Sequence, residues 1–355
     1  NSVRLDLATN QVIVQHPVGD PDQFAFDAVF NNTFSQKDIF IQEVQPLVDS
    51  VLQGYNATVF AYGQSGSGKT HTMTGNLDDP AQFGMMPQVV EYLFNEVKKM
   101  TSSTKQFKVK LSYVELYNGN SRDLIASQQV TLEIKENMSK NFYVKGAEVV
   151  EVSSLKECIN YFNMGTDRRR TASTDLNAHS SRSHSLFMLG VEQFDFEHDP
   201  SAPVIISSKI NVVDLAGSEK LSKTNATGET MKEGCNINLS LSALATVIDK
   251  LVKNEKHIPY RGSPLTMLLK DSLGGNSKTV MFANVGPSSQ NTSETISTLR
   301  FAERAKQIEN KPVKNLDPKD AKIQELLDKI AELQKRVGGG GLDEEERLQE
   351  RIEHL

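Results

Sequence analysis

Several residue types and sequence features are scarce in this chain of 355 residues. It contains no tryptophan and only two cysteines, Cys158 and Cys235, without the spacing of a metal site. Such sparse cysteine usage predicts a reduced, cytosolic environment in which both thiols are structural rather than reactive. Because no run of eighteen apolar residues occurs, no membrane-spanning helix is expected. The N-terminal residues also lack the basic and apolar regions of a secretory signal.

The chain has no excess of positive charge either. Its net charge is −6, and the last fourteen residues contribute −4 through six acidic side chains and two arginines. The remaining chain is therefore close to neutral, which argues against a nucleic-acid-binding protein because those usually carry a basic domain. A local basic patch that faces an acidic partner is still compatible with this balance.

Apolar runs alternate with helix-like segments from residue 1 to about residue 310. Runs rich in Val, Phe and Tyr predict strands at 56–63, 107–117, 209–217 and 278–286. Alternating residues at 183–191 predict a further strand, antiparallel to its neighbour. Helices are expected at 39–53 and 293–309. This order predicts an α/β domain with a central mixed β-sheet flanked by helices.

The pattern changes after residue 310. Asp317 is a good N-cap and Pro318 suits the first helical position, so a helix is expected to begin there. Its apolar residues are spaced 3, 4, 3, 4, which favours a coiled-coil partner; the alternative is a helix that packs on its own domain. The residues of this seam are Ile323, Leu326, Ile330, Leu333 and Val337.

These features divide the chain into four predicted parts. Residues 1–310 form the globular domain, 311–317 a linker, and 318–337 a short coiled-coil helix. Residues 338–355 contain a hinge of four glycines and an acidic, helix-like tail.

One segment has the pattern of a phosphate-binding loop. GQSGSGKT follows a predicted strand and fits G-x-x-x-x-G-K-[ST]. Its members are Gly63, Gln64, Ser65, Gly66, Ser67, Gly68, Lys69 and Thr70. Backbone N–H groups of such a loop surround phosphate oxygens, while Lys69 reaches the β- and γ-phosphates and Thr70 offers a hydroxyl to Mg²⁺. The alternative is a glycine-rich turn that binds nothing.

Two further segments indicate what happens to the nucleotide. Asp214 ends a predicted strand and Gly217 follows three residues later; an acid there can hold Mg²⁺ through a water, and a glycine N–H can bind a γ-phosphate. NAHSSRSH, residues 177–184, crowds serine and histidine side chains around an arginine. Hydroxyls and a guanidinium suit a γ-phosphate and its metal. Alone, this second segment would be interpreted as a solvated loop.

Together these motifs resemble a known family. GQSGSGKTHTM, NAHSSRSH and DLAGSE are similar to the P-loop, switch I and switch II of the kinesin motor domain. Further matches are SYVELYN, INLSLSAL, HIPYRGSPLTMLLKDSLGGNSKT and TLRFAERAKQIENKP. The resemblance covers nearly the whole chain. It implies a P-loop NTPase of the kinesin motor fold, with ATP or ADP and Mg²⁺ as ligands.

The resemblance also implies roles at the nucleotide. Ser183 would join Thr70 near Mg²⁺, and Asp214 would hold the metal through a water. His71 would flank the adenine, and Asn177 would contribute to the nucleotide site. The nucleotide is expected to be ATP rather than GTP because no N-K-x-D guanine motif is present.

The same resemblance assigns the hydrolytic residues. Ser181 would lie near the attacking water and the γ-phosphate, which the Gly217 N–H would sense. Arg182 and Glu219 would form an ion pair that closes the switches, and Glu219 would relay a proton from the water. An ordinary surface ion pair is the alternative for Arg182 and Glu219.

The implied partner is the microtubule, an acidic polymer. Candidate contact residues are Lys220, Lys223, Lys232, Lys256, His257, Tyr260 and Arg261. For any single lysine, a solvated side chain without a partner is the alternative. The chain departs from the family after HIPYR, where Gly262 and Pro264 replace an acid and a lysine.

The ends of the chain carry the finer expectations. The family's opening strand, which lines the adenine pocket, is absent from the sequence, and we interpret this as truncation. The neck follows the motor, as in plus-end-directed kinesins, and resembles that of intraflagellar-transport kinesins. A homo- or heterodimer, cargo adaptors on a tail outside this sequence, and a cytoplasmic or ciliary location are implied. The alternatives are a microtubule-depolymerising kinesin and a non-catalytic, microtubule-binding relative.

Overall fold

The structure is a computed structural model of the whole chain. It describes residues 2–16, 19–128, 131–138, 140–171, 182–197, 201–219 and 229–316, without the side chains of 170, 171 and 229–237. Within these ranges, no helix combines the length and apolarity that crossing a bilayer requires. The predicted coiled-coil helix at 318–337 and the tail at 338–355 lie outside the described residues.

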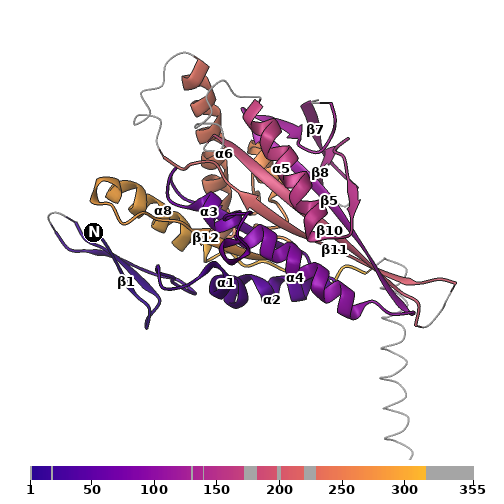
Figure 1. Cartoon of the computed structure of the whole chain (residues 1–355). Helices are drawn as coiled ribbons and strands as arrows, with labels where there is room; N and C mark the ends of the chain where they lie inside the picture. Colours follow the sequence, from indigo (N-terminus) through magenta and orange to yellow (C-terminus); the bar gives the residue numbers. More distant parts are fainter. Residues whose placement is uncertain are drawn as a thin grey trace, which may run out of the picture.

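A large mixed sheet runs through the middle of the domain (Figure 1). Its strands lie in the order β12-β4-β11-β10-β5-β6-β7-β8, and β9 pairs with β5. Their bounds are β4 (Ala57–Tyr62), β5 (Lys105–Tyr117), β6 (Asn120–Asp123), β7 (Thr131–Glu136), β8 (Phe142–Lys145), β9 (Val150–Val152), β10 (Ser183–Asp195), β11 (Val204–Asp214) and β12 (Lys278–Ala283). β4 is parallel to β11 and β12, whereas β10 is antiparallel to β5 and β11. The mixed sheet and the antiparallel β10 confirm the predictions.

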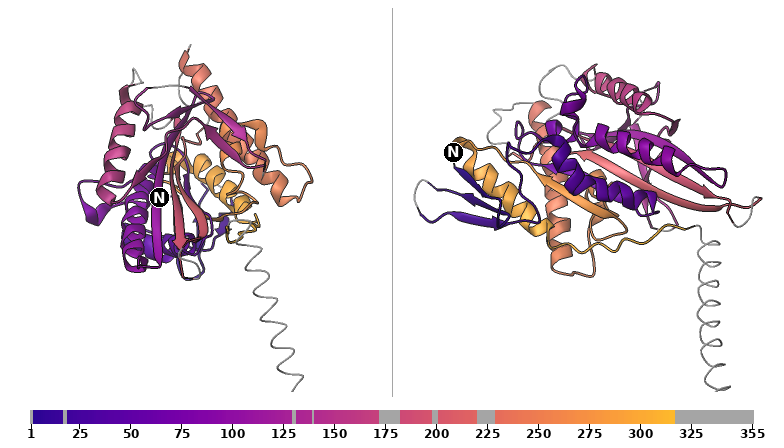
Figure 2. Two further views of the ribbon diagram at one scale, coloured as in Figure 1. Left: turned by 90° about the vertical axis from the view of Figure 1, so that its right-hand side faces the viewer. Right: turned by 60° about the horizontal axis from the view of Figure 1, so that its bottom comes forward.

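Helices cover both faces of this sheet (Figure 2). One face carries α1 (Gln36–Ile39), the π-helical turn η1 (Phe40–Val44), α2 (Gln45–Leu52), α4 (Met85–Met100) and α5 (Leu155–Thr171). The other carries α6 (Glu229–Val252), α7 (Pro264–Leu268) and α8 (Thr292–Ala305). Because both faces are covered, every residue of β4 is buried, which explains why all of them except Thr58 are apolar or aromatic.

The remaining short helices connect these elements. They are α3 (Lys69–Met73), η2 (Pro80–Gln82), η4 (Tyr260–Gly262) and η5 (Ser289–Asn291). The helix predicted at 39–53 is confirmed: the chain is helical without a gap from Gln36 to Leu52, with the π-helical turn η1 between α1 and α2. Pro46 lies in the first turn of α2 and offers no N–H to the preceding turn. The helix predicted at 293–309 ends earlier, at Ala305.

A second, three-stranded sheet packs beside α8. It contains β1 (Val3–Asp6), β2 (Gln11–Val14) and β3 (Asp22–Ala25). Val14 and Phe24 of this sheet share a small core with Leu299 of α8. β12 is the last strand of the large sheet, and its outer edge pairs with no strand in the described ranges. All its residues are accordingly partly exposed.

Cys158 confirms the expectation of a structural thiol. It lies on α5 with no exposed surface, and burial raises the pKa of its thiol to about 12. A thiol with so high a pKa carries almost no reactive thiolate near neutral pH. The side chain of Cys235 lies outside the description.

Candidate nucleotide site

The candidate site lies at the carboxyl ends of three parallel strands. The loop 63–68 follows β4, Asp214 is the last residue of β11, and Asn284 follows β12. Asp214 is in register with Ala61, and Ala283 with Tyr62, so all three ends meet at one edge of the sheet. Ligands of open α/β sheets bind at this edge because loops diverge there.

The loop requires glycine at particular positions. Gly63 has φ 151°, and a Cβ there would lie 2.2 Å from the carbonyl oxygen of Asn284. Gly68 has φ 98° and begins α3 in the left-handed region. Asn284 supports the loop further: its backbone N–H donates to Tyr62 at 2.8 Å, and its amide donates to Thr72 at 2.9 Å. Asn284 was missed in the sequence, where nothing distinguishes it from other loop asparagines.

Lys69 is folded back into this loop. Its side chain is 94% buried, and Nζ donates to the carbonyl oxygen of Gln64 at 2.9 Å. Burial lowers the pKa of Lys69, and the negative charges of Asp214 and Glu219 oppose that shift. An ammonium has three N–H donors, so Lys69 can bind a phosphate oxygen in addition to, or in place of, this carbonyl.

Asp214 connects the loop to β11. Its Oδ2 accepts a hydrogen bond from the Thr70 hydroxyl at 2.8 Å. Its Oδ1 is buried and has no hydrogen-bond partner among the described residues. Burial raises the pKa of Asp214, against the hydrogen bond of Thr70 and the charges of Arg169 and Lys69. A free carboxylate oxygen beside a hydroxyl is the oxygen donor set that Mg²⁺ takes, so these residues fit the predicted metal.

Glu219 lies against the P-loop. Its Oε2 accepts from the backbone N–H of Ser65 at 2.8 Å, and its Oε1 accepts from the Ser65 hydroxyl at 2.5 Å. The sequence-based expectation was an ion pair with Arg182; the contacts that the structure gives this carboxylate go to Ser65 instead. A Cβ at Gly217 would lie 2.3 Å from Glu219 and 2.4 Å from the Ser65 hydroxyl, so this contact requires glycine there.

A buried ion pair holds Ser183, the predicted second hydroxyl ligand. Arg169, at the end of α5, donates through Nη2 to the Ser183 hydroxyl at 2.8 Å and through Nε to Glu115 at 3.1 Å. The Glu115 side chain is only 1% exposed. A buried charge needs such a partner. Neither Arg169 nor Glu115 was among the residues predicted from the sequence, although an acid within the apolar run 107–117 signals a buried cation nearby.

His71 extends from α3 at the surface. The amide of Gln36, the first residue of α1, donates to the His71 carbonyl at 2.6 Å and lies 3.2 Å from ring atom Nδ1. The ring is therefore exposed but held from one side. Asn177 and Ser181 lie outside the described residues, so their predicted roles stay predictions.

Comparisons with known proteins give the family. The kinesin motor domain model matches residues 4–308. The chain belongs to the kinesin motor domain family. Kinesin motor domains bind ATP and ADP and are microtubule-dependent ATPases, so this chain carries an ATPase domain of that family.

Individual relatives agree with this assignment. Kinesin-like protein Klp68D of Drosophila melanogaster is 42% identical over 315 residues, which cover 89% of this chain and 39% of the relative. The chain thus spans about two fifths of the length of that curated relative. A solved fast kinesin is 41% identical with a TM-score of 0.82, over 89% of this chain and 88% of that one. A KIF14 dimer with AMP-PNP on a microtubule is 37% identical with a TM-score of 0.84, over 92% and 93%.

The predicted microtubule-contact residues of this kinesin differ in how far they are exposed. Lys256 and His257 are exposed. Arg261 is exposed as well, but it pairs with Glu136 of β7 and lies over the ring of Phe142, 5.9 Å from its centroid. Lys220 and Lys223 lie outside the described residues, as does the Lys232 side chain.

Tyr260 serves the fold instead. Its hydroxyl donates to the Leu273 carbonyl at 2.6 Å, and burial raises the pKa of that hydroxyl to about 12. Tyr260 is only partly buried, so its predicted contact with the microtubule stays a prediction. Nearby, Ser263 caps α7 and Pro264 occupies its first turn, which gives the departure from the family's usual sequence a structural role.

Proposed function

We propose that this chain is the motor domain of a microtubule-stimulated ATPase that converts ATP hydrolysis into movement along microtubules. The observation that carries the proposal is a pair of contacts from the P-loop: Thr70 with Asp214 at the end of β11, and Ser65 with Glu219 in the segment that follows β11. Through these contacts, the residues around Gly217 would sense a ligand bound in the P-loop. The relative solved on a microtubule supports tubulin as the partner.

The residues divide the work of hydrolysis. Lys69 would leave the Gln64 carbonyl for the β- and γ-phosphates, and the Gly217 N–H would bind the γ-phosphate. Glu219 would exchange Ser65 for the attacking water and accept its proton. Thr70, Ser183 and Asp214 would hold Mg²⁺, which when bound neutralises charge on the phosphates. Positioning of the water and the γ-phosphate would provide most of the rate enhancement.

The segment 311–316 supports a neck linker at 311–317. It runs along the opposite end of the sheet (Figure 2). Asn315 donates through its backbone to the Gly54 carbonyl at 2.9 Å, and its amide exchanges hydrogen bonds with Asn56 and Asn276 at 3.0 and 2.9 Å. Leu316 pairs with Ile206 of β11. This segment would dock when ATP orders the switches and detach otherwise.

The direction of movement, the transport class, the location and the dimeric state are proposed from the sequence. A neck after the motor supports plus-end direction, and the N-x-D-P-K-D-A pattern supports the intraflagellar-transport class with a location in the cytoplasm or cilium. The heptad seam at 318–337 supports a homo- or heterodimer. Cargo transport, along intraflagellar or vesicle routes, is the role that these features fit together.

Phosphate release in the presence of polymerised tubulin tests the proposal. ATP turnover should be slow without microtubules and should rise steeply with their concentration, while GTP turnover stays low. Free tubulin dimers are the control. Turnover that does not respond to microtubules would refute a microtubule-stimulated ATPase, and loss of polymer mass during the assay would identify the depolymerising alternative.

A further inference from the structure

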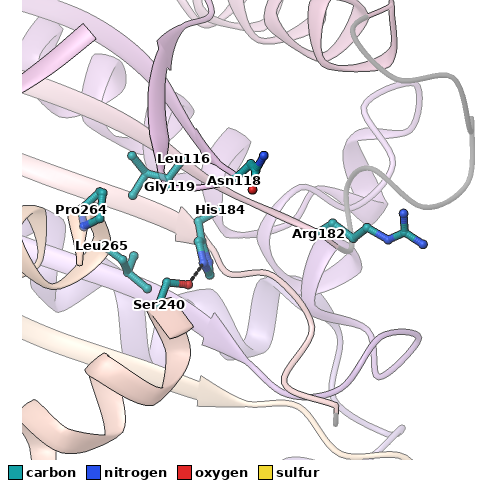
Figure 3. Close-up of a pocket in the computed structure, with 8 residues that line it drawn as sticks. All are labelled: Leu116, Asn118, Gly119, Arg182, His184, Ser240, Pro264 and Leu265. Atoms are coloured by element: carbon teal, nitrogen blue, oxygen red, sulfur yellow. Dashed lines mark hydrogen bonds between the residues drawn. The ribbon is translucent and has the colours of Figure 1, made fainter. Parts of the chain in front are cut away.

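His184 is a buried polar residue to which the roles above assign nothing. It is the second residue of β10, and only 3% of its surface is exposed. A cavity of about 20 Å³ lies beside its ring, large enough for one water at most (Figure 3). The cavity is also lined by Arg182 of switch I and by Pro264 and Leu265 of α7.

Both ring nitrogens of His184 are engaged. Nδ1 accepts the backbone N–H of Ala216 at 3.0 Å, and Nε2 lies 2.7 Å from the hydroxyl of Ser240. Because Nδ1 is an acceptor, the proton of the neutral ring is on Nε2, which donates to Ser240.

The two partners belong to different parts of the proposed mechanism. Ala216 immediately precedes Gly217, whose N–H is the proposed sensor of the γ-phosphate. Ser240 is on α6, the helix that follows switch II, beside Leu239, which is 61% exposed. The ring is thus a rigid link between the phosphate-sensing loop and α6, and it also contacts the cavity at the start of α7.

The two partners of His184 belong to distant parts of the chain. The neutral ring has one acceptor and one donor nitrogen, and His184 uses them to join a backbone group 32 residues away to a side chain 56 residues away. A planar ring with no rotatable bond between its two nitrogens transmits a displacement of Ala216 to Ser240 with little slack.

We propose that His184 is a positioning residue that couples nucleotide state at Gly217 to the orientation of α6, and so sets how strongly microtubules stimulate turnover. The inference rests on the proposed microtubule-stimulated ATPase. It does not require His184 to touch the nucleotide or tubulin.

Ser240→Ala tests the link between Ala216 and Ser240 with the smaller structural change. It removes one hydroxyl from α6 and leaves the bond to Ala216 intact. The ratio of microtubule-stimulated to basal turnover should fall by roughly threefold to tenfold, the range for loss of one hydrogen bond. The acceleration of fluorescent-ADP release by microtubules should fall by the same factor. Basal turnover and nucleotide affinity should stay within about twofold of the original chain.

Four further variants separate coupling from folding. Ser240→Thr keeps the hydroxyl and should restore the ratio. Ser242→Ala removes an exposed hydroxyl from the same helix and should change nothing. His184→Asn retains an acceptor near the Nδ1 position but cannot reach Ser240, so it should match Ser240→Ala. The double variant Ser240→Ala/His184→Asn should have a stimulation ratio no lower than that of either single variant, because both substitutions remove the same hydrogen bond.

The outcomes are distinguishable. An unchanged stimulation ratio in Ser240→Ala, or an equal loss of basal and stimulated turnover in Ser240→Ala and His184→Asn, would overturn the coupling role. Additive losses in the double variant would do so too. If the original chain itself shows no microtubule stimulation, the proposed function fails first, before any variant is compared.

Discussion

The two ends of the large sheet hold polar residues in contrasting ways. At the carboxyl ends of β4, β11 and β5, the groups are charged and buried: Lys69, Asp214 and the pair of Arg169 with Glu115. At the amino ends of β4, β11 and β12, the segment 311–316 is held by neutral amides and backbone groups, chiefly those of Asn315.

The difference matches what each end would do. Buried charges are costly without partners, so the first end is completed by a charged ligand and changes when that ligand changes. Neutral hydrogen bonds contribute only about 0.5–1.5 kcal/mol each, so a segment held by a few of them can detach and rebind. One end is therefore suited to sensing and the other to reversible docking.

Removal of the charge at the first end should have the largest effect. Lys69→Ala should weaken ATP and ADP binding by roughly a hundredfold or more, because charge-assisted contacts to phosphate are lost and Asp214 loses one of its two nearby cations. Fluorescent-nucleotide titration measures this affinity. Lys98→Ala, an exposed lysine of α4, is the control. Unchanged affinity in Lys69→Ala would refute the assignment of the P-loop.

Glu219 should separate binding from turnover. Glu219→Ala should bind ATP normally and lose turnover by about 10²–10⁴, the usual contribution of a general base. Glu219→Gln keeps an acceptor for Ser65 but cannot take a proton, so it should be as slow as the alanine variant. Rapid-quench measurement of phosphate formation checks both variants. Normal hydrolysis in Glu219→Gln would mean that the residue only holds the loop.

The second end should respond more mildly. Asn315→Ala removes the amide that joins Gly54, Asn56 and Asn276, so gliding velocity should fall severalfold while ATP turnover persists. Lys311→Gln is a suitable control, since Lys311 contacts Gly275 through its backbone N–H. Equal velocities in the two variants would favour a passive tether over a docking segment.

Some of this comparison could be predicted from sequence. The P-loop, its position after a strand, and Asp214 at a strand end follow local rules of spacing and strand pattern, and the structure confirms where they lie. The mixed sheet followed from apolar runs alternating with helical segments. These features depend on residues close together in the chain.

The misses have a common cause. The contact of Glu219 with Ser65 spans 154 residues, Arg169 with Glu115 spans 54, and Asn315 with Asn56 spans 259. Such pairings depend on how strands β5, β10 and β11 are ordered in the sheet, which spacing does not reveal. The helix at 39–53 was predicted correctly, whereas its π-helical turn η1 was not, although Pro46 is a local signal for an irregularity there.

Gliding of polarity-marked microtubules over surface-bound chains tests the central claim most directly. With ATP, we expect steady gliding with the minus end leading, as for a plus-end-directed motor, and no gliding with a non-hydrolysable analogue. ATP turnover without any gliding, or shortening of the microtubules in place of movement, would contradict the account.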